Sequence, residues 1–238
     1  MTKLYFRSTT NGTSGLPTDE QSTLTRTVLG ADAVTLNRTL STTKGTTQTS
    51  INLTSGAVTS QQTGYWGRFV SDTLNMTSIA AQTWTYNFGH SQSSNFANFP
   101  SNGSAPVYCH CYIWRPSNSS KIATIIDGNS IGSVSEPGSA NNEESGHTTF
   151  SGAAVSFQVG DVIIFEVWFR WTQTLGNALT LRWFYDGLTE NTTNGASVTN
   201  HASFIDSPAT LTFGAPPSAI DATSDAKNVL KPITMVKV

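Results

Sequence analysis

The chain has 238 residues and a formal net charge of −2, and only 12% of its residues are charged, about half of the usual share of roughly 25%. Ser and Thr supply 65 of the residues, about 27%, and 17 Asn extend this small polar set. Such a composition excludes a disordered charged tail, a coiled coil or a helical bundle as the main architecture, and the weak charge argues against nucleic-acid binding.

Alternation of apolar and polar residues with a period of two dominates the chain, and it predicts strands rather than helices. In chain order, the predicted strands cover residues 4–7, 33–40, 49–53, 65–71, 83–88, 107–114, 121–126, 153–157, 162–171, 179–185 and 209–213. The strongest of them, 162–171, follows a Gly-Asp turn pair and is rich in β-branched and aromatic residues. Strands joined by Gly, Asn, Ser and Pro turns predict an all-β fold, an antiparallel β-sandwich of jelly-roll type.

The domain organisation follows from where the strands stop. We expect residues 1–213 to form the sandwich, with an N-terminal arm at residues 8–32 that has few apolar anchors and a long connection at residues 127–148. Residues 214–238 are predicted to be an extended C-terminal tail, which cannot bury enough surface to become ordered without a partner chain. Its candidate assembly residues are Pro216, Pro217, Ile233, Met235 and Val236.

No motif for catalysis, a cofactor or a metal emerges. Cys109-His110-Cys111 is the most metal-like triplet, but on a strand the two cysteines point to one face and the histidine to the other, so they cannot converge on one ion. Buried core cysteines are the preferred interpretation. The Asn-rich, acidic connection at residues 127–148 leaves an oxygen-ligand calcium site as an alternative, without the spacing of an EF-hand.

Glu166 interrupts the most apolar strand, and a buried carboxylate needs a partner. The candidate partners in a buried ion pair are Arg170, Arg182 and Lys121. The alternative is a pair of catalytic carboxylates for glycoside hydrolysis, drawn from Glu166, Asp161 and Asp186. Asp161 and Asp186 lie in Gly-Asp and Asp-Gly turns, where a short side chain that caps its own backbone is the ordinary explanation. Structural pairing is therefore preferred.

Exposed aromatic rings on a sandwich can stack on sugar rings, so the tryptophans are candidate glycan or partner contacts. The best placed are Trp66, Trp114 and Trp171, which lie at strand ends. The alternative is that these rings belong to the core, because their neighbours in the strands are apolar.

Five segments carry a resemblance to a known group. They are Lys3–Arg7, Gly67–Ser71, Tyr112–Pro116, Gly160–Trp168 and Phe184–Gly187. Together, over residues 1–213, they are similar to uncharacterised β-sandwich virion proteins of tailed phages and, more generally, to jelly-roll capsid decoration (cement) proteins. The resemblance implies a virion surface protein, commonly trimeric, that clamps neighbouring major capsid subunits. It implies no catalytic residues, because that group has no catalytic motif to match.

The residues and the resemblance favour the same function. Uncharged hydroxyls and amides are buried at subunit contacts at a smaller desolvation cost than charged groups. We expect a non-enzymatic protein, made in the host cytoplasm, that binds the major capsid protein on the outer capsid surface as a homotrimer. The alternative is a carbohydrate- or receptor-binding module of a tail fibre or baseplate, with a host-surface glycan as its partner. A glycan-active enzyme is the third possibility weighed.

Overall fold

The computed structural model describes most of the chain, and nearly all of the described backbone is strand or turn. The described residues are 1–26, 28–29, 36–55, 62–92, 105–127, 130–134, 143–171, 179–193, 196–197 and 199–214. Within these ranges there is no α-helix, and no helix is long and apolar enough to cross a membrane. A single 3₁₀ turn, Pro116–Asn118, connects two strands there.

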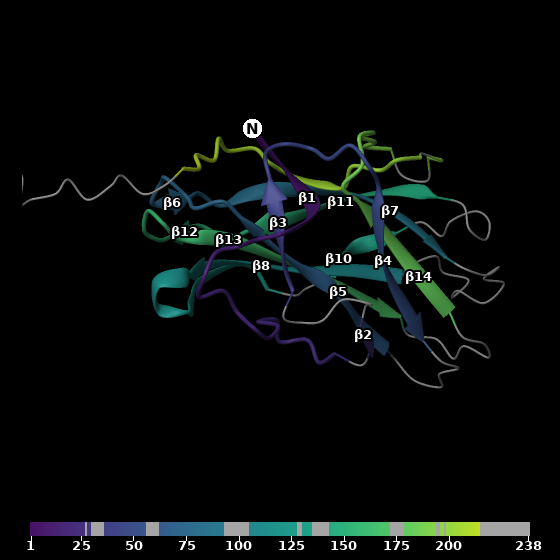
Figure 1. Cartoon of the computed structure of the whole chain (residues 1–238), viewed down its shortest axis with the longest axis horizontal. Helices are drawn as coiled ribbons and strands as arrows, with labels where there is room; N and C mark the ends of the chain where they lie inside the picture. Colours follow the sequence, from purple (N-terminus) through teal and green to yellow (C-terminus); the bar gives the residue numbers. More distant parts are fainter. Residues whose placement is uncertain are drawn as a thin grey trace, which may run out of the picture.

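The described residues form fifteen strands, and Figure 1 shows how most of them are arranged. They are β1 (Thr2–Thr10), β2 (Val28–Leu29), β3 (Asn37–Ser41), β4 (Thr49–Ser55), β5 (Gln62–Ser71), β6 (Ser78–Ile79), β7 (Gln82–Gln92), β8 (Ala105–Arg115), β9 (Ser120–Ile126), β10 (Ser130–Val134), β11 (Glu144–Gly152), β12 (Val155–Ser156), β13 (Val162–Trp171), β14 (Leu179–Tyr185) and β15 (Phe204–Ser207).

Hydrogen bonds connect 13 of these strands into one large sheet that folds over itself into two layers, and β6 pairs with β12 in a separate two-stranded sheet. The large sheet has the order β10-β8-β13-β5-β3-β1-β15-β7-β14-β4, with β9 added beside β8, β11 beside β7 and β2 beside β5. Strand β3 joins the layers, because it pairs antiparallel with β1 and parallel with β5. Apart from the pairs β3–β5 and β2–β5, every described pairing between strands is antiparallel.

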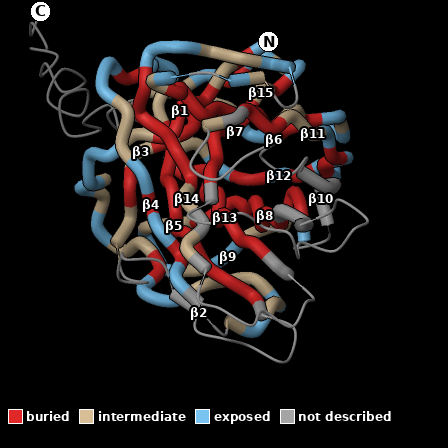
Figure 2. The backbone as a smooth tube through the Cα atoms, turned by 90° about the vertical axis from the view of Figure 1, so that its right-hand side faces the viewer, coloured by how far each residue is buried: buried red, intermediate tan, exposed pale blue. Residues whose placement is uncertain are grey.

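Aromatic side chains from both layers fill the space between them. Phe6 on β1 lies 4.8 Å from Phe69 on β5, 5.5 Å from Phe165 on β13 and 5.2 Å from Trp183 on β14, measured between ring centroids. Edge-to-face pairs of this kind stabilise a core beyond the area they bury. Figure 2 shows the result as a continuous buried interior along the central strands.

The predicted fold class, an all-β antiparallel sandwich, is confirmed, with two parallel pairings in addition. Its jelly-roll connectivity stays a prediction. Two local expectations are wrong. The long connection predicted at residues 127–148 contains β10 and most of β11, and the last strand in the described part of the chain lies at Phe204–Ser207 rather than at 209–213.

The apolar–polar alternation of the sequence does not reveal strand β11, because a glycine occupies one of the positions that point into the core. Gly146 pairs with Phe88 on β7, and a Cβ atom at this position would lie 2.3 Å from the Phe88 ring. The ring therefore fills the space that an apolar side chain of β11 would otherwise take.

Candidate functional site

The predicted N-terminal arm lies on the protein's own sheet. It is a loop whose two ends are joined, since the backbone N–H of Asn11 donates to the carbonyl of Asn37 at 2.8 Å. We call residues 11–36 the covering loop, of which 11–26, 28–29 and 36 are described, and residues 28–29 form strand β2, which pairs with β5. Residues of the segment 11–26 pack on the outer face of β5, β13 and β8.

This outer face is apolar because alternate residues of central strands point away from the core. Two clusters form it, and we call them together the outer aromatic face. They comprise Val70, Tyr112, Trp114, Val162 and Ile164 in one, and Tyr65, Tyr108 and Trp168 in the other. Leu16 packs against the first cluster and Leu24 against the second. Without the loop, this face would be exposed to solvent, and an apolar surface of that kind is usually an interaction site.

The covering loop is fastened mainly through its backbone, at every second residue. Nε1 of Trp114 donates to the Gly15 carbonyl at 2.7 Å. Arg68 donates from Nη1 to the Pro17 carbonyl at 2.6 Å and from Nη2 to the Asp19 carbonyl. The carbonyl groups of residues 15, 17 and 19 therefore all accept hydrogen bonds from side chains of the sheet.

The next odd-numbered residue, Gln21, continues the pattern and spans three strands. Its N–H donates to the Glu166 carboxylate at 3.0 and 3.2 Å, and its carbonyl accepts from Nζ of Lys121 at 3.1 Å. Glu166 is on β13 and Lys121 on β9, so Gln21 lies across β8, which separates them.

Glu166 and Arg68 form a fully buried ion pair beneath the loop. Arg68 Nε lies 3.3 Å from Glu166 Oε1, and both side chains are 0% exposed. The Tyr112 hydroxyl donates to the same oxygen at 3.0 Å. Burial raises the pKa of the Glu166 carboxyl, while the charge of Arg68 and the donated hydrogen bonds oppose that rise. A buried pair with these extra hydrogen bonds is the arrangement in which two buried charges are tolerated.

The ion-pair partner that the structure shows for Glu166 is Arg68, which is not among the predicted candidates. The side chain of Arg170 lies outside the described residues, and Arg182 is on β14, opposite Ser91 of β7. Lys121 reaches the covering loop rather than the carboxylate. A signal for Arg68 was present, because it interrupts the apolar strand 65–71 as Glu166 interrupts 162–171.

The tryptophans predicted to contact glycans are placed inside the protein where their side chains are described. Trp66 is 2% exposed and packs on Phe169 and Trp183. Trp114 is 5% exposed under the covering loop. The side chain of Trp171 lies outside the described residues. Neither described ring offers a free face for stacking on a sugar, so the core alternative holds for both.

The two carboxylates considered for catalysis each have a structural partner. The Asp161 carboxylate accepts a bidentate pair of hydrogen bonds from the Arg115 guanidinium, each 2.8 Å long, and a further hydrogen bond from the Gln158 N–H. Asp186 accepts from Arg7 and from the backbone N–H of Ser8, which ties the β14 turn to β1. Both aspartates thus stabilise turns, as their sequence context indicates.

The Cys109-His110-Cys111 triplet does not converge on a point. Cys109 and Cys111 lie in the core and are buried free thiols, and burial raises the pKa of both. His110 lies on the opposite face, where Nδ1 is 3.6 Å from Oδ1 of Asp127, and burial lowers the pKa of the imidazole to about 4. Among the described residues, no group of three or more potential ligands could hold a metal ion. Within residues 127–148, which carry the calcium alternative, residues 128–129 and 135–142 lie outside the described part of the chain.

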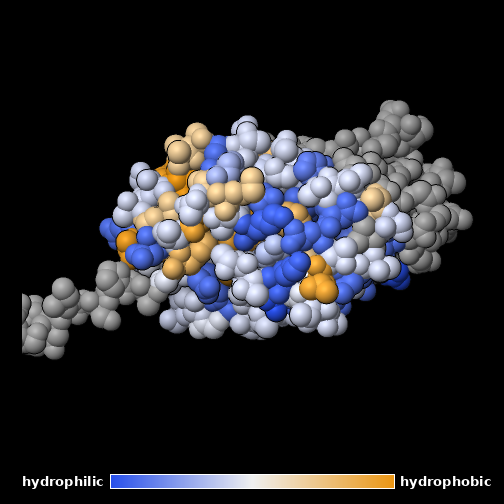
Figure 3. All heavy atoms as spheres, turned by 90° about the horizontal axis from the view of Figure 1, so that it is seen from above, coloured by the Kyte–Doolittle hydropathy of each residue, from blue (hydrophilic) through white to orange (hydrophobic). Residues whose placement is uncertain are grey.

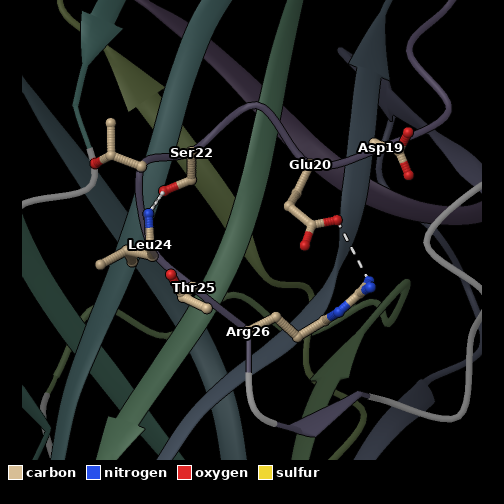
Figure 4. A pocket seen from close by; sticks show the side chains of 7 residues that line it. Asp19, Glu20, Ser22, Leu24, Thr25 and Arg26 are labelled. Atoms are coloured by element: carbon tan, nitrogen blue, oxygen red, sulfur yellow. Dashed lines mark hydrogen bonds and ion pairs between the residues drawn. The ribbon is translucent and has the colours of Figure 1, made fainter.

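An open, polar depression lies on the covering loop itself. Figure 4 shows Asp19, Glu20, Ser22, Leu24, Thr25 and Arg26 along its wall. Arg26 Nη1 pairs with Glu20 Oε2 at 3.3 Å, and Ser22 Oγ accepts from the Leu24 N–H at 3.1 Å. These contacts stay within the loop and shape it.

Comparisons with known proteins add little to this geometry. A scan against protein-family models and a search of curated proteins give no match. Among solved structures, a chain from the structure of infectious bursal disease virus (Gx strain) is similar over 68% of this chain and 36% of that chain, with 8% sequence identity and a TM-score of 0.20. This chain therefore spans about a third of the length of the viral chain, and a likeness of this strength carries no argument about function.

Proposed function

We propose that the protein is a non-enzymatic virion structural protein that decorates the outer surface of a phage capsid by binding the major capsid protein. The observation that carries the proposal is that the buried charged side chains of the protein have structural roles. Glu166 and Arg68 fasten the covering loop, Asp161 fixes a turn through Arg115, and Asp186 ties β14 to β1. In the described part of the chain these charges hold covering segments and turns to the sandwich.

The surface chemistry supports the same proposal. With 12% charged residues and about 27% Ser and Thr, the exterior offers hydroxyls and amides in place of Lys and Glu. Figure 3 shows one face of the molecule as mainly hydrophilic, with apolar areas gathered toward the end that carries β6 and β12. Uncharged polar groups can be buried against a partner at low desolvation cost, and this suits a protein that functions by adhesion.

The residues that directly precede the predicted C-terminal tail are bonded to the sandwich. Leu74 forms a bridge with Phe213, and the Gly214 N–H donates to the Thr73 carbonyl at 3.0 Å. The tail residues Pro216, Pro217, Ile233, Met235 and Val236 lie outside the described residues. We propose that residues 215–238 make contact with the capsid or with a neighbouring copy in a homotrimer.

Truncation after Gly214 tests this proposal. The shortened chain should keep the melting temperature of the full chain, because the described core ends at the bridge to Phe213. It should bind purified capsids more weakly than the full chain in co-sedimentation. Equal occupancy of the two chains on particles would contradict the role of the tail, and binding of neither chain would contradict the proposed function.

The glycan-binding alternative has no specific observation in its favour, since Trp66 and Trp114 are buried. A glycan array probed with the full chain tests it independently of the capsid assay. Binding that survives replacement of both rings would require a site elsewhere on the surface.

A further inference from the structure

Asn11 anchors the start of the covering loop through both its backbone and its side chain. Its N–H donates to the Asn37 carbonyl at 2.8 Å, and its side-chain Nδ2 donates to the Val70 carbonyl of β5 at 3.1 Å. Its side-chain Oδ1 accepts from the Thr13 N–H at 3.0 Å. Asparagine often begins a loop with such an Asx turn. Both polar groups of the Asn11 amide therefore hold backbone groups in place.

The residue that follows Asn11 is a glycine whose N–H is free. Gly12 is exposed, and its N–H takes part in no hydrogen bond of the described part of the chain. A Cβ atom at this position would have no heavy atom within 4 Å. Asparagine is a thermolabile residue, and its amide is most open to attack by the next backbone nitrogen when that residue has no side chain. Asn11 thus has an unhindered nucleophile directly beside its amide.

The hydrogen bond from Thr13 activates this amide for attack. When the Gly12 nitrogen adds to Cγ of Asn11, negative charge develops on Oδ1, which already accepts from the Thr13 N–H. A donor placed in advance on such an oxygen stabilises the transition state, as an oxyanion hole does. The amide nitrogen that must leave is held by the Val70 carbonyl. The turn therefore presents both the activated carbonyl and the free nitrogen that the reaction needs.

We propose that Asn11 is a site of spontaneous deamidation, which loosens the anchor of the covering loop on β5. The Gly12 nitrogen loses its proton and forms a bond to Cγ of Asn11, the bond from Cγ to Nδ2 breaks, and the amino group leaves with a proton as ammonia. Water then opens the cyclic succinimide at either carbonyl, which restores the Gly12 N–H and gives aspartate or isoaspartate. The new carboxylate cannot donate to the Val70 carbonyl, so that hydrogen bond is lost.

Asn191 is a matched comparison within the same chain. Its Oδ1 accepts from the Thr193 N–H at 2.8 Å, so it forms the same kind of turn as Asn11. The residue between them is Thr192, however, and its β-branched side chain hinders closure of the succinimide ring. Asn191 should therefore keep its amide in the folded protein.

Peptide mass spectrometry of the full-length protein tests the proposal. The native chain and the chain unfolded in urea are held at mildly alkaline pH and physiological temperature, and the amide and acid forms of each peptide are quantified over time. We expect Asn11 to convert in the native chain no more slowly than in urea, while Asn191 keeps its amide. Slower conversion of Asn11 in the native chain, or conversion of Asn191 at the same rate as Asn11, would overturn the proposal.

Two variants separate the reaction from its effect on the loop. Gly12→Ala should melt no lower than the wild type, because the added methyl group meets no heavy atom within 4 Å, and it should lose most of the conversion at Asn11. An unchanged rate in this variant would also overturn the proposal. Asn11→Asp reproduces one product and should melt about 2–4 °C below the wild type, the shift expected from the loss of one hydrogen bond in a domain of this size. Equal melting temperatures would contradict the loosening of the anchor.

Discussion

Replacement of Glu166 by Leu gives the sharpest test of how the covering loop is held. The substitution removes the carboxylate that accepts from Arg68, Tyr112 and the Gln21 N–H. Arg68 then remains 0% exposed with a full charge and no carboxylate beside it. Breaking a buried pair by removing one partner costs about 3–5 kcal/mol.

This loss is large enough to read in a melting curve. For a domain of 150–250 residues, each kcal/mol shifts Tm by about 2–4 °C, so the variant should melt roughly 10 °C below the wild type. The single replacement Arg68→Met should cost a similar amount, because it leaves Glu166 buried and charged or forces its protonation.

The double variant Arg68→Met with Glu166→Leu distinguishes a paired charge from two independent contacts. It removes both charges, so the remaining loss comes mainly from the Gln21 N–H, which loses its acceptor, and from the Pro17 and Asp19 carbonyls. Those carbonyls lose the bonds from Arg68 but keep the bonds from Asn37 Nδ2 and Gln21 Nε2. We expect the double variant to lose about 2–3 kcal/mol, less than either single variant. Urea unfolding of all four proteins measures the coupling. Additive losses would refute the reasoning.

Three further predictions follow from other parts of the structure. Gly146→Ala should lower Tm by several degrees. The Cβ atom of the new alanine would lie 2.3 Å from the Phe88 ring, and overpacking a core costs about 1–3 kcal/mol. An unchanged melting curve would show that the Phe88 ring can move aside. Burial lowers the pKa of His110 from 6.5 to about 4, so the folded state favours the neutral imidazole. As pH falls through that window, the wild type should lose about 3 kcal/mol of unfolding free energy relative to His110→Phe. Parallel pH profiles of the two proteins would contradict this prediction. Cys109 and Cys111 are buried thiols, and burial raises the pKa of both. A thiol reagent should therefore label them only in denaturant. Rapid labelling of the native protein would count against their place in the core.

Much of the fold was accessible from sequence because strands that are buried on one face alternate strictly. The run 83–88 shows this, with Trp84, Tyr86 and Phe88 all in the core. The strand 107–114 is apolar or aromatic on both faces, and the structure shows that Cys109 and Cys111 face the core while Tyr112 and Trp114 face the covering loop.

The covering loop could not be predicted in the same way. Its segment 15–21 has little apolar character and is held through backbone atoms. Contacts through the backbone do not depend on the residue type, so they give no signal in the sequence. The identity of the ion pair was hidden for a related reason. Glu166 and Arg68 lie 98 positions apart in sequence, and the register of β5 against β13 brings them together. Local patterns do not encode the register of strands that are distant in the chain.

The most direct test of the proposed role is whether the full-length chain binds virus particles. Purified protein is mixed with phage capsids and separated on a density gradient, and the fractions are analysed by mass spectrometry. The proposed role predicts that the chain migrates with intact capsids at a fixed ratio to the major capsid protein. A chain that stays at the top of the gradient while the particles sediment would contradict it.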